Sequence, residues 1–286
     1  MKIVRTVAEL RDVVRSARQR GARVGLVPTM GAFHEGHLAL MQRARERSGF
    51  VVVSLFVNPT QFNDPKDLIC YPRDETRDAE LARSVEADVL FAPPVDEIYP
   101  DRFSTSVQVA GLSDPLEGTM RGPAHFRGVA TVVTKLLNMA QPDDAYFGQK
   151  DAQQALIVRR LVRDLDIPTH IEICPTVREP DGLAMSSRNV RLDPVERQRA
   201  PALFRALRAV EAAVAEGGHD AGRALAAGEA ILAEAGIVPE YFAAVSPDTL
   251  EPVARITDET LVAVAANLGG VRLIDNVLVH PGAHER

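Results

Sequence analysis

The sequence is poor in cysteine, has no long apolar run and carries no excess of positive charge. Its two cysteines, Cys70 and Cys174, are too few for a disulfide framework or a cysteine-based metal cluster. No apolar run approaches the length of a membrane span, so we expect no membrane partner. The formal net charge of −6 argues against nucleic acid as a major partner, because phosphate backbones bind basic surfaces. Together these absences favour a cytoplasmic protein.

The composition is typical of a globular protein. Of the 286 residues, 46% are hydrophobic and 25% are charged, which suits one large domain or two smaller domains with buried cores. Near the N-terminus, Thr6 and Glu9 have the spacing of a capping box, and the apolar residues after them follow a helical period. We therefore expect a packed amphipathic helix there rather than a targeting segment.

Short apolar strands alternate with helical patterns between residues 24 and 174. The expected strands are 24–28, 51–57, 89–92, 145–147 and 171–174, and the expected helices include 76–86, 129–139 and 152–164. This alternation predicts an α/β fold, a Rossmann-like, doubly wound parallel sheet with helices on both faces. An irregular insertion, 93–126, contains one strand-like piece at 105–109.

The pattern changes after Cys174. A polar segment with a hairpin turn at Asp181-Gly182 is followed by two alanine-rich helices and three strand-like runs. The helices are expected near 199–216 and 221–235, and the strands at 241–245, 260–266 and 271–279. We predict a first domain, 1–176, and a smaller C-terminal α+β domain, 177–286.

The run from Pro28 to His37 combines a glycine-containing turn with two histidines at the start of a helix. Gly31 and Gly36 allow the backbone to approach a ligand closely. Backbone N–H groups and the macrodipole at a helix start attract phosphate. Because His34 and His37 are three residues apart, both can face one phosphate. The run predicts a binding site for a nucleoside triphosphate.

Two other interpretations of the histidine pair remain open. The pair could bind a metal, although it lacks the spacing and the intervening glutamate of a zinc-protease helix, and no third ligand stands nearby. The histidines could also be structural. At the level of function, two further alternatives stay open: a zinc hydrolase that uses His34 and His37, and a nucleotide-binding module without catalytic activity.

Further polar clusters follow the other expected strands. They are 58–63 after the second strand, 148–154 after the fourth, and 175–177, leading into 185–188, after the fifth. Ligands bind beyond the carboxyl ends of the strands in open α/β sheets. We therefore expect these clusters to meet at one edge of the sheet.

Five motifs in this order and spacing resemble the pantoate–β-alanine ligase (pantothenate synthetase) family. The motifs are 28–37, 56–62 (FVNPTQF), 71–73 (YPR), 147–154 (FGQKDAQQ) and 181–189 (DGLAMSSRN). The family belongs to the nucleotidyltransferase superfamily, together with class I aminoacyl-tRNA synthetases. The resemblance implies that pantoate carboxylate attacks the α-phosphate of MgATP, releasing pyrophosphate, and that β-alanine then displaces AMP from pantoyl adenylate to give pantothenate.

The resemblance also implies roles for individual residues. The implied catalytic residues are His37 as proton donor, His34, Lys150 and Arg188. Gln61 and Gln154 would bind pantoate, and Gln61 would also bind β-alanine. The implied ATP-binding residues are Met30, Gly31, Ala32, Phe33, His34, Glu35, Gly36, His37, Gly148, Gln149, Lys150, Asp151, Val177, Met185, Ser186, Ser187 and Arg188.

The resemblance further implies a homodimer and a smaller domain that closes over the nucleotide, carrying Arg188. The sequence departs from the family pattern at Gln149, where a glutamate is common, and at Arg77, near acids that help to hold Mg²⁺. Asp74, Glu75 and Asp78 remain as candidate acids, so direct ligation of magnesium by the protein stays open. The main rival function is a nucleotidylyltransferase of the same superfamily, which would need a basic pocket for a phosphorylated acceptor.

Overall fold

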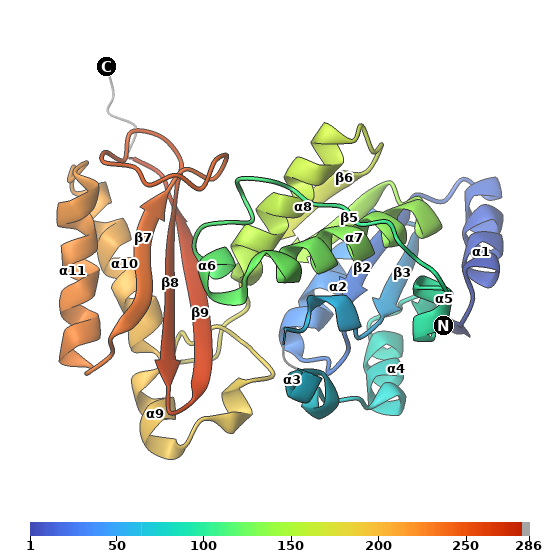
Figure 1. Ribbon diagram of the computed structural model, residues 1–286, viewed down its shortest axis with the longest axis horizontal. Coiled ribbons are helices and arrows are strands. Elements are labelled where there is room, and N and C mark those ends of the chain that lie inside the picture. Colours follow the sequence, from blue (N-terminus) through green and yellow to red (C-terminus); the bar gives the residue numbers. More distant parts are fainter. Residues whose placement is uncertain (64, 282–286) are drawn as a thin grey trace. The chain divides into compact units, whose positions relative to one another are not determined.

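The computed structural model describes residues 1–63 and 65–281. Its contacts divide the chain into two units (Figure 1). The first unit comprises Met1–Gln149 and Gln153–Pro175, and the second comprises Lys150–Ala152 and Thr176–Arg286. The predicted domain boundary, between residues 176 and 177, stays a prediction, and the last five positions of that second domain, 282–286, lie outside the described residues.

The first unit is built on a parallel sheet of six strands in the order β1-β4-β3-β2-β5-β6. The strands are β1 (Lys2–Val4), β2 (Val24–Thr29), β3 (Phe50–Leu55), β4 (Val89–Phe91), β5 (Asp144–Gly148) and β6 (His170–Cys174). From β2 the chain proceeds to one side through β3 and β4, then returns to the other side for β5 and β6. The order reverses between β2 and β5, which is where ligands bind in such sheets. The predicted doubly wound sheet is confirmed, and β1 is an addition to it.

Helices cover both faces of this sheet. They are α1 (Val7–Gln19), α2 (Glu35–Arg47), α4 (Glu75–Ser84), α7 (Pro123–Ala140) and α8 (Ala152–Asp164), with the shorter α3 (Pro65–Cys70), α5 (Val95–Ile98) and α6 (Glu117–Arg121) and the 3₁₀ turns η1 (Pro59–Gln61) and η2 (Gln149–Asp151). At the start of α1, the Glu9 N–H donates to Thr6 Oγ1 and the Thr6 N–H donates to Glu9 Oε2. The predicted capping box is therefore confirmed.

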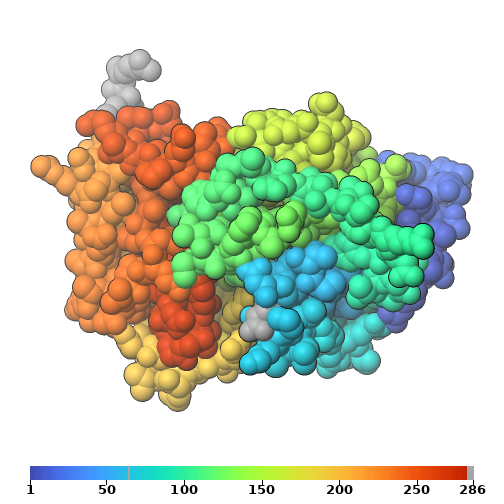
Figure 2. All heavy atoms as spheres, viewed as in Figure 1, coloured from blue at the N-terminus to red at the C-terminus, as the bar shows by residue number. Residues whose placement is uncertain are grey.

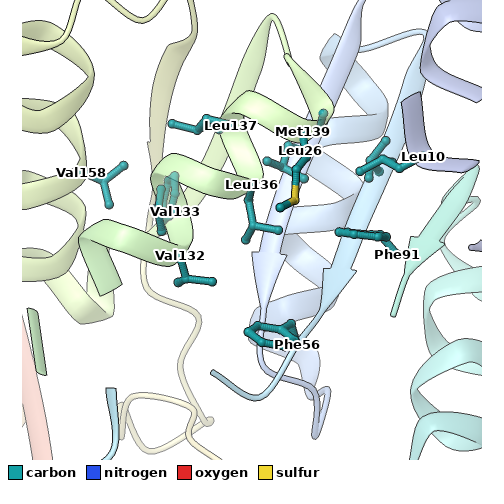
Figure 3. Close-up of a cluster of buried hydrophobic side chains, with 14 of the residues drawn as sticks. Leu10, Leu26, Phe56, Phe91, Val132, Val133, Leu136, Leu137, Met139 and Val158 are labelled. Atoms are coloured by element: carbon teal, nitrogen blue, oxygen red, sulfur yellow. The ribbon is translucent and has the colours of Figure 1, made fainter. Parts of the chain in front are cut away.

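Neighbouring residues of one strand enter different cores, because side chains alternate across a strand. In β3, Val52 packs with α1, α7 and α8, whereas Val51 and Val53 pack with α2 and α4. Figure 3 shows the first of these cores, with Met139 and Leu136 of α7 near Leu26 of β2. The loop after β2 therefore leads to a helix on one face, and the loop after β5 leads to a helix on the other.

The insertion between β4 and α7 contains no strand at 105–109, so that prediction is wrong. The Val107 N–H donates to the Thr131 hydroxyl of α7, 3.0 Å away, instead of to a neighbouring strand. Val107 and Val109 pack against the core, which explains their apolar character. In Figure 2 the teal and green atoms of the insertion and α7 cover the strands of this unit on the visible face.

The second unit packs helices against a three-stranded antiparallel sheet, β7-β8-β9. Its elements are η3 (Asn189–Arg191), α9 (Pro194–Arg199), α10 (Ala202–Ala215), α11 (Ala221–Glu234), β7 (Pro239–Val245), β8 (Thr260–Leu268) and β9 (Val271–Val279). A core of small and branched apolar side chains joins α10, α11 and the sheet. The predicted α+β character is confirmed. No helix within the described ranges is long and apolar enough to cross a bilayer.

Candidate functional site

The turn after β2 is held by a buried carboxylate. Asp78 of α4 is 1% exposed and accepts hydrogen bonds from the N–H groups of Ala32 and Phe33, both at 2.8 Å. Gly31 and Ala32 have φ values of 90° and 54°, in the left-handed region that favours glycine. A Cβ on Gly31 would lie 2.9 Å from Asp78 Oδ2. The carboxylate therefore fixes a backbone shape that few sequences adopt.

The two histidines form a close, tilted pair at the start of α2. Their ring centroids are 4.2 Å apart with an interplanar angle of 50°. His34 Nδ1 accepts from the Gly36 N–H at 3.1 Å, and His37 Nδ1 accepts from the His34 N–H at 3.3 Å. A neutral imidazole has one donor and one acceptor nitrogen, so both rings carry their proton on Nε2. The pair therefore presents two N–H donors at the positive end of a helix.

Several backbone N–H groups of this turn already have acceptors within the protein. The N–H groups of Ala32 and Phe33 bind Asp78, and those of His34 and Gly36 bind the imidazoles. Side-chain capping satisfies these donors, as at other helix starts. An anion bound here would therefore depend chiefly on the Nε2–H groups and the helix dipole.

In the turn after β3, neighbouring side chains fix the orientation of the Gln61 amide. Gln61 Oε1 accepts from Asn58 Nδ2 at 3.0 Å, and Gln61 Nε2 lies 3.1 Å from Met30 Sδ. Asn58 is 1% exposed, and its Oδ1 accepts from the Tyr99 hydroxyl at 2.8 Å. A phenol is protonated at neutral pH, and burial raises the pKa of Tyr99 further. The structure thus brings Met30 and Gln61 together in the first unit.

Three residues that the sequence argument did not single out support this amide. They are Asn58, Tyr99 and His125, whose Nδ1 lies 2.7 Å from the Gln61 carbonyl oxygen. Asn58 lies in the same motif as Gln61, 56–62, so the sequence itself indicated that Asn58 could belong to the site. Tyr99 and His125 come from the irregular insertion and the start of α7, where no periodic pattern indicated their role.

Helix α7 approaches this turn very closely. A Cβ on Gly128 would lie 2.4 Å from the Thr60 carbonyl oxygen and 2.8 Å from the Gln61 nitrogen. The Gly128 carbonyl oxygen also accepts from Asn58 Nδ2 at 3.2 Å. Only glycine allows these two backbones to lie in contact.

The end of β5 and the start of α8 carry the remaining residues of the first unit. A Cβ on Gly148 would meet no atom within 4 Å, and Gln149 and Gln154 are half-buried. Gln153, by contrast, is 5% exposed and binds the insertion, accepting from the Glu117 N–H and donating to the carbonyls of Leu112 and Pro115. Of the two adjacent glutamines, Gln153 therefore has a structural role.

In the second unit, a hairpin leads into the serine-rich segment. The Met185 N–H donates to the Val177 carbonyl, and the Gly182 N–H donates to Glu179, which places Asp181 and Gly182 in the predicted turn. The segment then closes on itself, because the Arg188 N–H donates to Ser186 Oγ at 3.2 Å and the Asn189 N–H to the Ser186 carbonyl at 3.0 Å. Ser187 is half-buried and Arg188 is exposed.

Lys150 and Asp151 group with the second unit, although Gln149 and Gln153 group with the first. Asn276 Nδ2 of β9 donates to the Lys150 carbonyl oxygen at 3.0 Å. Lys150 is half-buried and Asp151 is exposed. The candidate residues are therefore divided between the two units.

The three acids considered for magnesium all have other partners. Asp74 Oδ1 accepts from the Arg77 N–H at the start of α4, and Glu75 pairs with Arg5 at 2.5 Å. Asp78 binds the turn after β2. Across residues 1–63 and 65–281, no three His, Cys, Asp or Glu side chains gather as metal ligands. The acids present, which already have partners within the protein, do not fit a direct magnesium site.

Comparison with known proteins identifies the family. A model of the pantoate-beta-alanine ligase family matches residues 2–278. The chain is 52% identical over 278 residues to a pantothenate synthetase of Cereibacter sphaeroides, which covers 97% of this chain and 99% of the relative. It is 50% identical to a pantothenate synthetase of Roseiflexus castenholzii over 280 residues, 98% of this chain and 99% of the relative.

Solved structures agree with the sequence relatives. The pantothenate synthetase of Thermus thermophilus has a TM-score of 0.92 at 49% identity and covers 98% of this chain and 100% of its own. The pantoate-beta-alanine ligase of Francisella tularensis, complexed with beta-gamma ATP and beta-alanine, has a TM-score of 0.78 at 34% identity, covering 97% of each chain. The chain belongs to the pantoate–β-alanine ligase family.

Proposed function

We propose that this chain is an ATP-dependent ligase that condenses (R)-pantoate with β-alanine to form pantothenate. The observation that carries the proposal is the pair of Nε2–H donors of His34 and His37, which follow β2 at the reversal point of the sheet. Family membership over residues 2–278 supports the same substrates, and the Francisella relative binds beta-alanine and an ATP compound.

The reaction has two steps that balance without a further reagent. A carboxylate oxygen of pantoate attacks the α-phosphorus, the bond to the bridging oxygen breaks, and pyrophosphate leaves. The amine of β-alanine then attacks the acyl carbon, AMP departs with the former carboxylate oxygen, and the amine loses a proton. The first step brings two anions together, so donors that are already in place must stabilise the developing charge.

On the first unit, we assign the triphosphate to the segment Met30–His37, with Gly148 and Gln149. His34 and His37 donate hydrogen bonds to the phosphates through Nε2, and His37 acts as the donor to the leaving pyrophosphate without giving up its proton. The fixed Nδ1 acceptors support this assignment, because they hold both rings in the donor tautomer without any reorganisation during the reaction.

On the second unit, we assign Lys150 and the segment Met185–Arg188 to the phosphates, Asp151 to the ribose and Val177 to the adenine border. Lys150 and Arg188 are the cations of this set and stabilise the charge that builds up at phosphorus. We further propose that the second unit, carrying these residues, closes over the bound nucleotide as a lid.

We assign pantoate to Gln61 and Gln154, and β-alanine to Gln61. Gln61 is a neutral amide beside the apolar Met30, which suits hydroxyls and a carboxylate on a branched aliphatic body. A phosphorylated acceptor would instead need cations at this position. The nucleotidylyltransferase alternative is therefore disfavoured.

We propose MgATP as the nucleotide substrate, with the metal held by phosphate oxygens and water. Magnesium keeps several waters readily, and the engagement of Asp74, Glu75 and Asp78 with other partners supports this arrangement. From the family resemblance we also propose a cytoplasmic homodimer. Light scattering of the purified protein at micromolar concentration tests the oligomeric state, and a monomer mass would reject the dimer.

The experiment that tests the function is the exchange of labelled pyrophosphate into ATP. We expect exchange with MgATP and pantoate, and no exchange when pantoate is omitted. A non-catalytic nucleotide-binding module would give no exchange in either case. A zinc hydrolase would lose its activity to a zinc-selective chelator in the presence of magnesium, whereas the proposed ligase would keep its exchange activity.

A further inference from the structure

Two consecutive buried residues of β9 hold separate segments of the second unit. Asp275 and Asn276 are each 3% exposed. Asp275 forms two hydrogen bonds with Arg178, at 2.6 and 3.0 Å, and Asn276 Nδ2 donates to the Lys150 carbonyl at 3.0 Å. The first contact reaches the hairpin that leads into Ser186–Arg188, and the second reaches Lys150.

The guanidinium of Arg178 has several partners besides Asp275. Arg178 Nη1 also donates to the Gly182 carbonyl at 3.0 Å, and its guanidinium lies 3.6 Å above the ring centroid of Phe204. Burial raises the pKa of the Asp275 carboxyl, while the guanidinium of Arg178 and the ammonium of Lys150 oppose that shift. The Lys150 charge therefore acts on the same carboxyl that fixes the hairpin.

The contact with Asn276 explains why Lys150 groups with the second unit. Lys150–Ala152 form a short insertion of that unit between two stretches of the first, so the chain crosses between the units on both sides of it. Such a segment needs an anchor if it is to keep one position on its unit. A buried amide that donates to a main-chain carbonyl supplies that anchor without introducing a charge.

We propose that Asn276 is a positioning residue for the adenylation step: by holding the Lys150 main chain on β9, it sets the lysine for the phosphates together with Ser186–Arg188. The inference rests on the proposed function. It means that Lys150 moves with the second unit. Lys150 and Arg188, the two cations that we assign to the phosphates, then reach the nucleotide together.

A double-mutant cycle tests the proposal. Asn276→Ala should lower the rate of pantoyl-adenylate formation about tenfold, the equivalent of about 1.4 kcal/mol, with a smaller change in the KM for pantoate. Lys150→Ala alone should lower the rate by about 100-fold. Because Asn276 acts through Lys150, Asn276→Ala should change the rate less than about twofold in the Lys150→Ala background.

Asn267→Ala is the matched control. Asn267 lies near the end of β8, at the turn into β9, and accepts from the Gly270 N–H, and the variant should leave adenylate formation unchanged. Should Asn276→Ala fail to fold, Asn276→Leu, which keeps a similar side-chain shape but removes the donor without adding a charge, takes its place in the cycle.

Multiplicative effects of the two substitutions would overturn the proposal, because they would mean that Asn276 acts on the rate independently of Lys150. So would an unchanged rate in a folded Asn276 variant. Failure of the proposed function is distinguishable, because the unsubstituted protein itself would then form no adenylate.

Discussion

Asp78→Asn is the substitution whose effect the structure predicts most directly. The carboxylate accepts two N–H groups, those of Ala32 and Phe33, and is 1% exposed. Asparagine has almost the same shape but only one acceptor oxygen. One of the two N–H groups would therefore face the amide nitrogen, which is also a donor.

The magnitude follows from these two contacts. A hydrogen bond to a charged group contributes about 1.5–3 kcal/mol, and a buried donor left without an acceptor costs about 1–3 kcal/mol. We expect Asp78→Asn to lower the free energy of unfolding by about 2 kcal/mol or more. The turn that carries His34 and His37 loses one of its supports, so the KM for ATP should rise as well.

Urea denaturation followed by circular dichroism measures the first effect, since the chain contains no tryptophan. Asp74→Asn is the control: it removes the same charge from the start of the same helix, but Asp74 accepts one exposed N–H, a role that asparagine performs equally well. Its stability should change by less than about 0.5 kcal/mol. Equal stabilities of the two variants would refute the reasoning.

Three further predictions concern single residues. Gly128→Ala should destabilise the protein by about 1–3 kcal/mol and raise the KM for pantoate, because its Cβ would lie 2.4 Å from the Thr60 carbonyl oxygen. Thermal melts and steady-state kinetics measure the two effects, and Gly222→Ala in α11 is the control that we expect to be tolerated. Gln61→Ala should raise the KM for pantoate more than that for ATP, and equal losses in initial-rate kinetics would contradict the assignment. The hydrogen bond from Arg23 lowers the pKa of the Asp144 carboxyl below 3.8, so the stability that this ionised carboxylate contributes should be lost as the pH falls below 3.8. The free energies of unfolding of the parent and of Asp144→Asn, measured by urea titration, should therefore converge in acid, and a constant difference would contradict this.

The sequence predicted the sheet well because its central strands are continuous apolar runs. Val51–Val53 in β3 must be buried on both faces, and only a sheet covered by helices on both sides offers that environment. The strand β1 was missed because Lys2–Val4 is too short to show a pattern. The apolar residues at 105–109 were misread as a strand, although their backbone binds the Thr131 side chain.

The histidine turn was recognisable from local sequence, but its supports were not. The sequence offered Asp78 only as a candidate magnesium ligand. The tertiary structure places its carboxylate against Ala32 and Phe33, and Phe33 is 45 residues away from Asp78 along the chain. Asn276 is likewise separated from Lys150 by 126 positions. Contacts of this kind depend on how distant elements pack, which periodicity and spacing do not encode.

The central claim, that pantoate is activated as an adenylate, is tested most directly by following a carboxylate oxygen. Pantoate labelled in its carboxylate with a heavy oxygen isotope is converted in the presence of MgATP and β-alanine, and AMP is analysed by mass spectrometry. The account predicts one labelled oxygen in AMP for each pantothenate formed. Unlabelled AMP, or label recovered in inorganic phosphate, would contradict it.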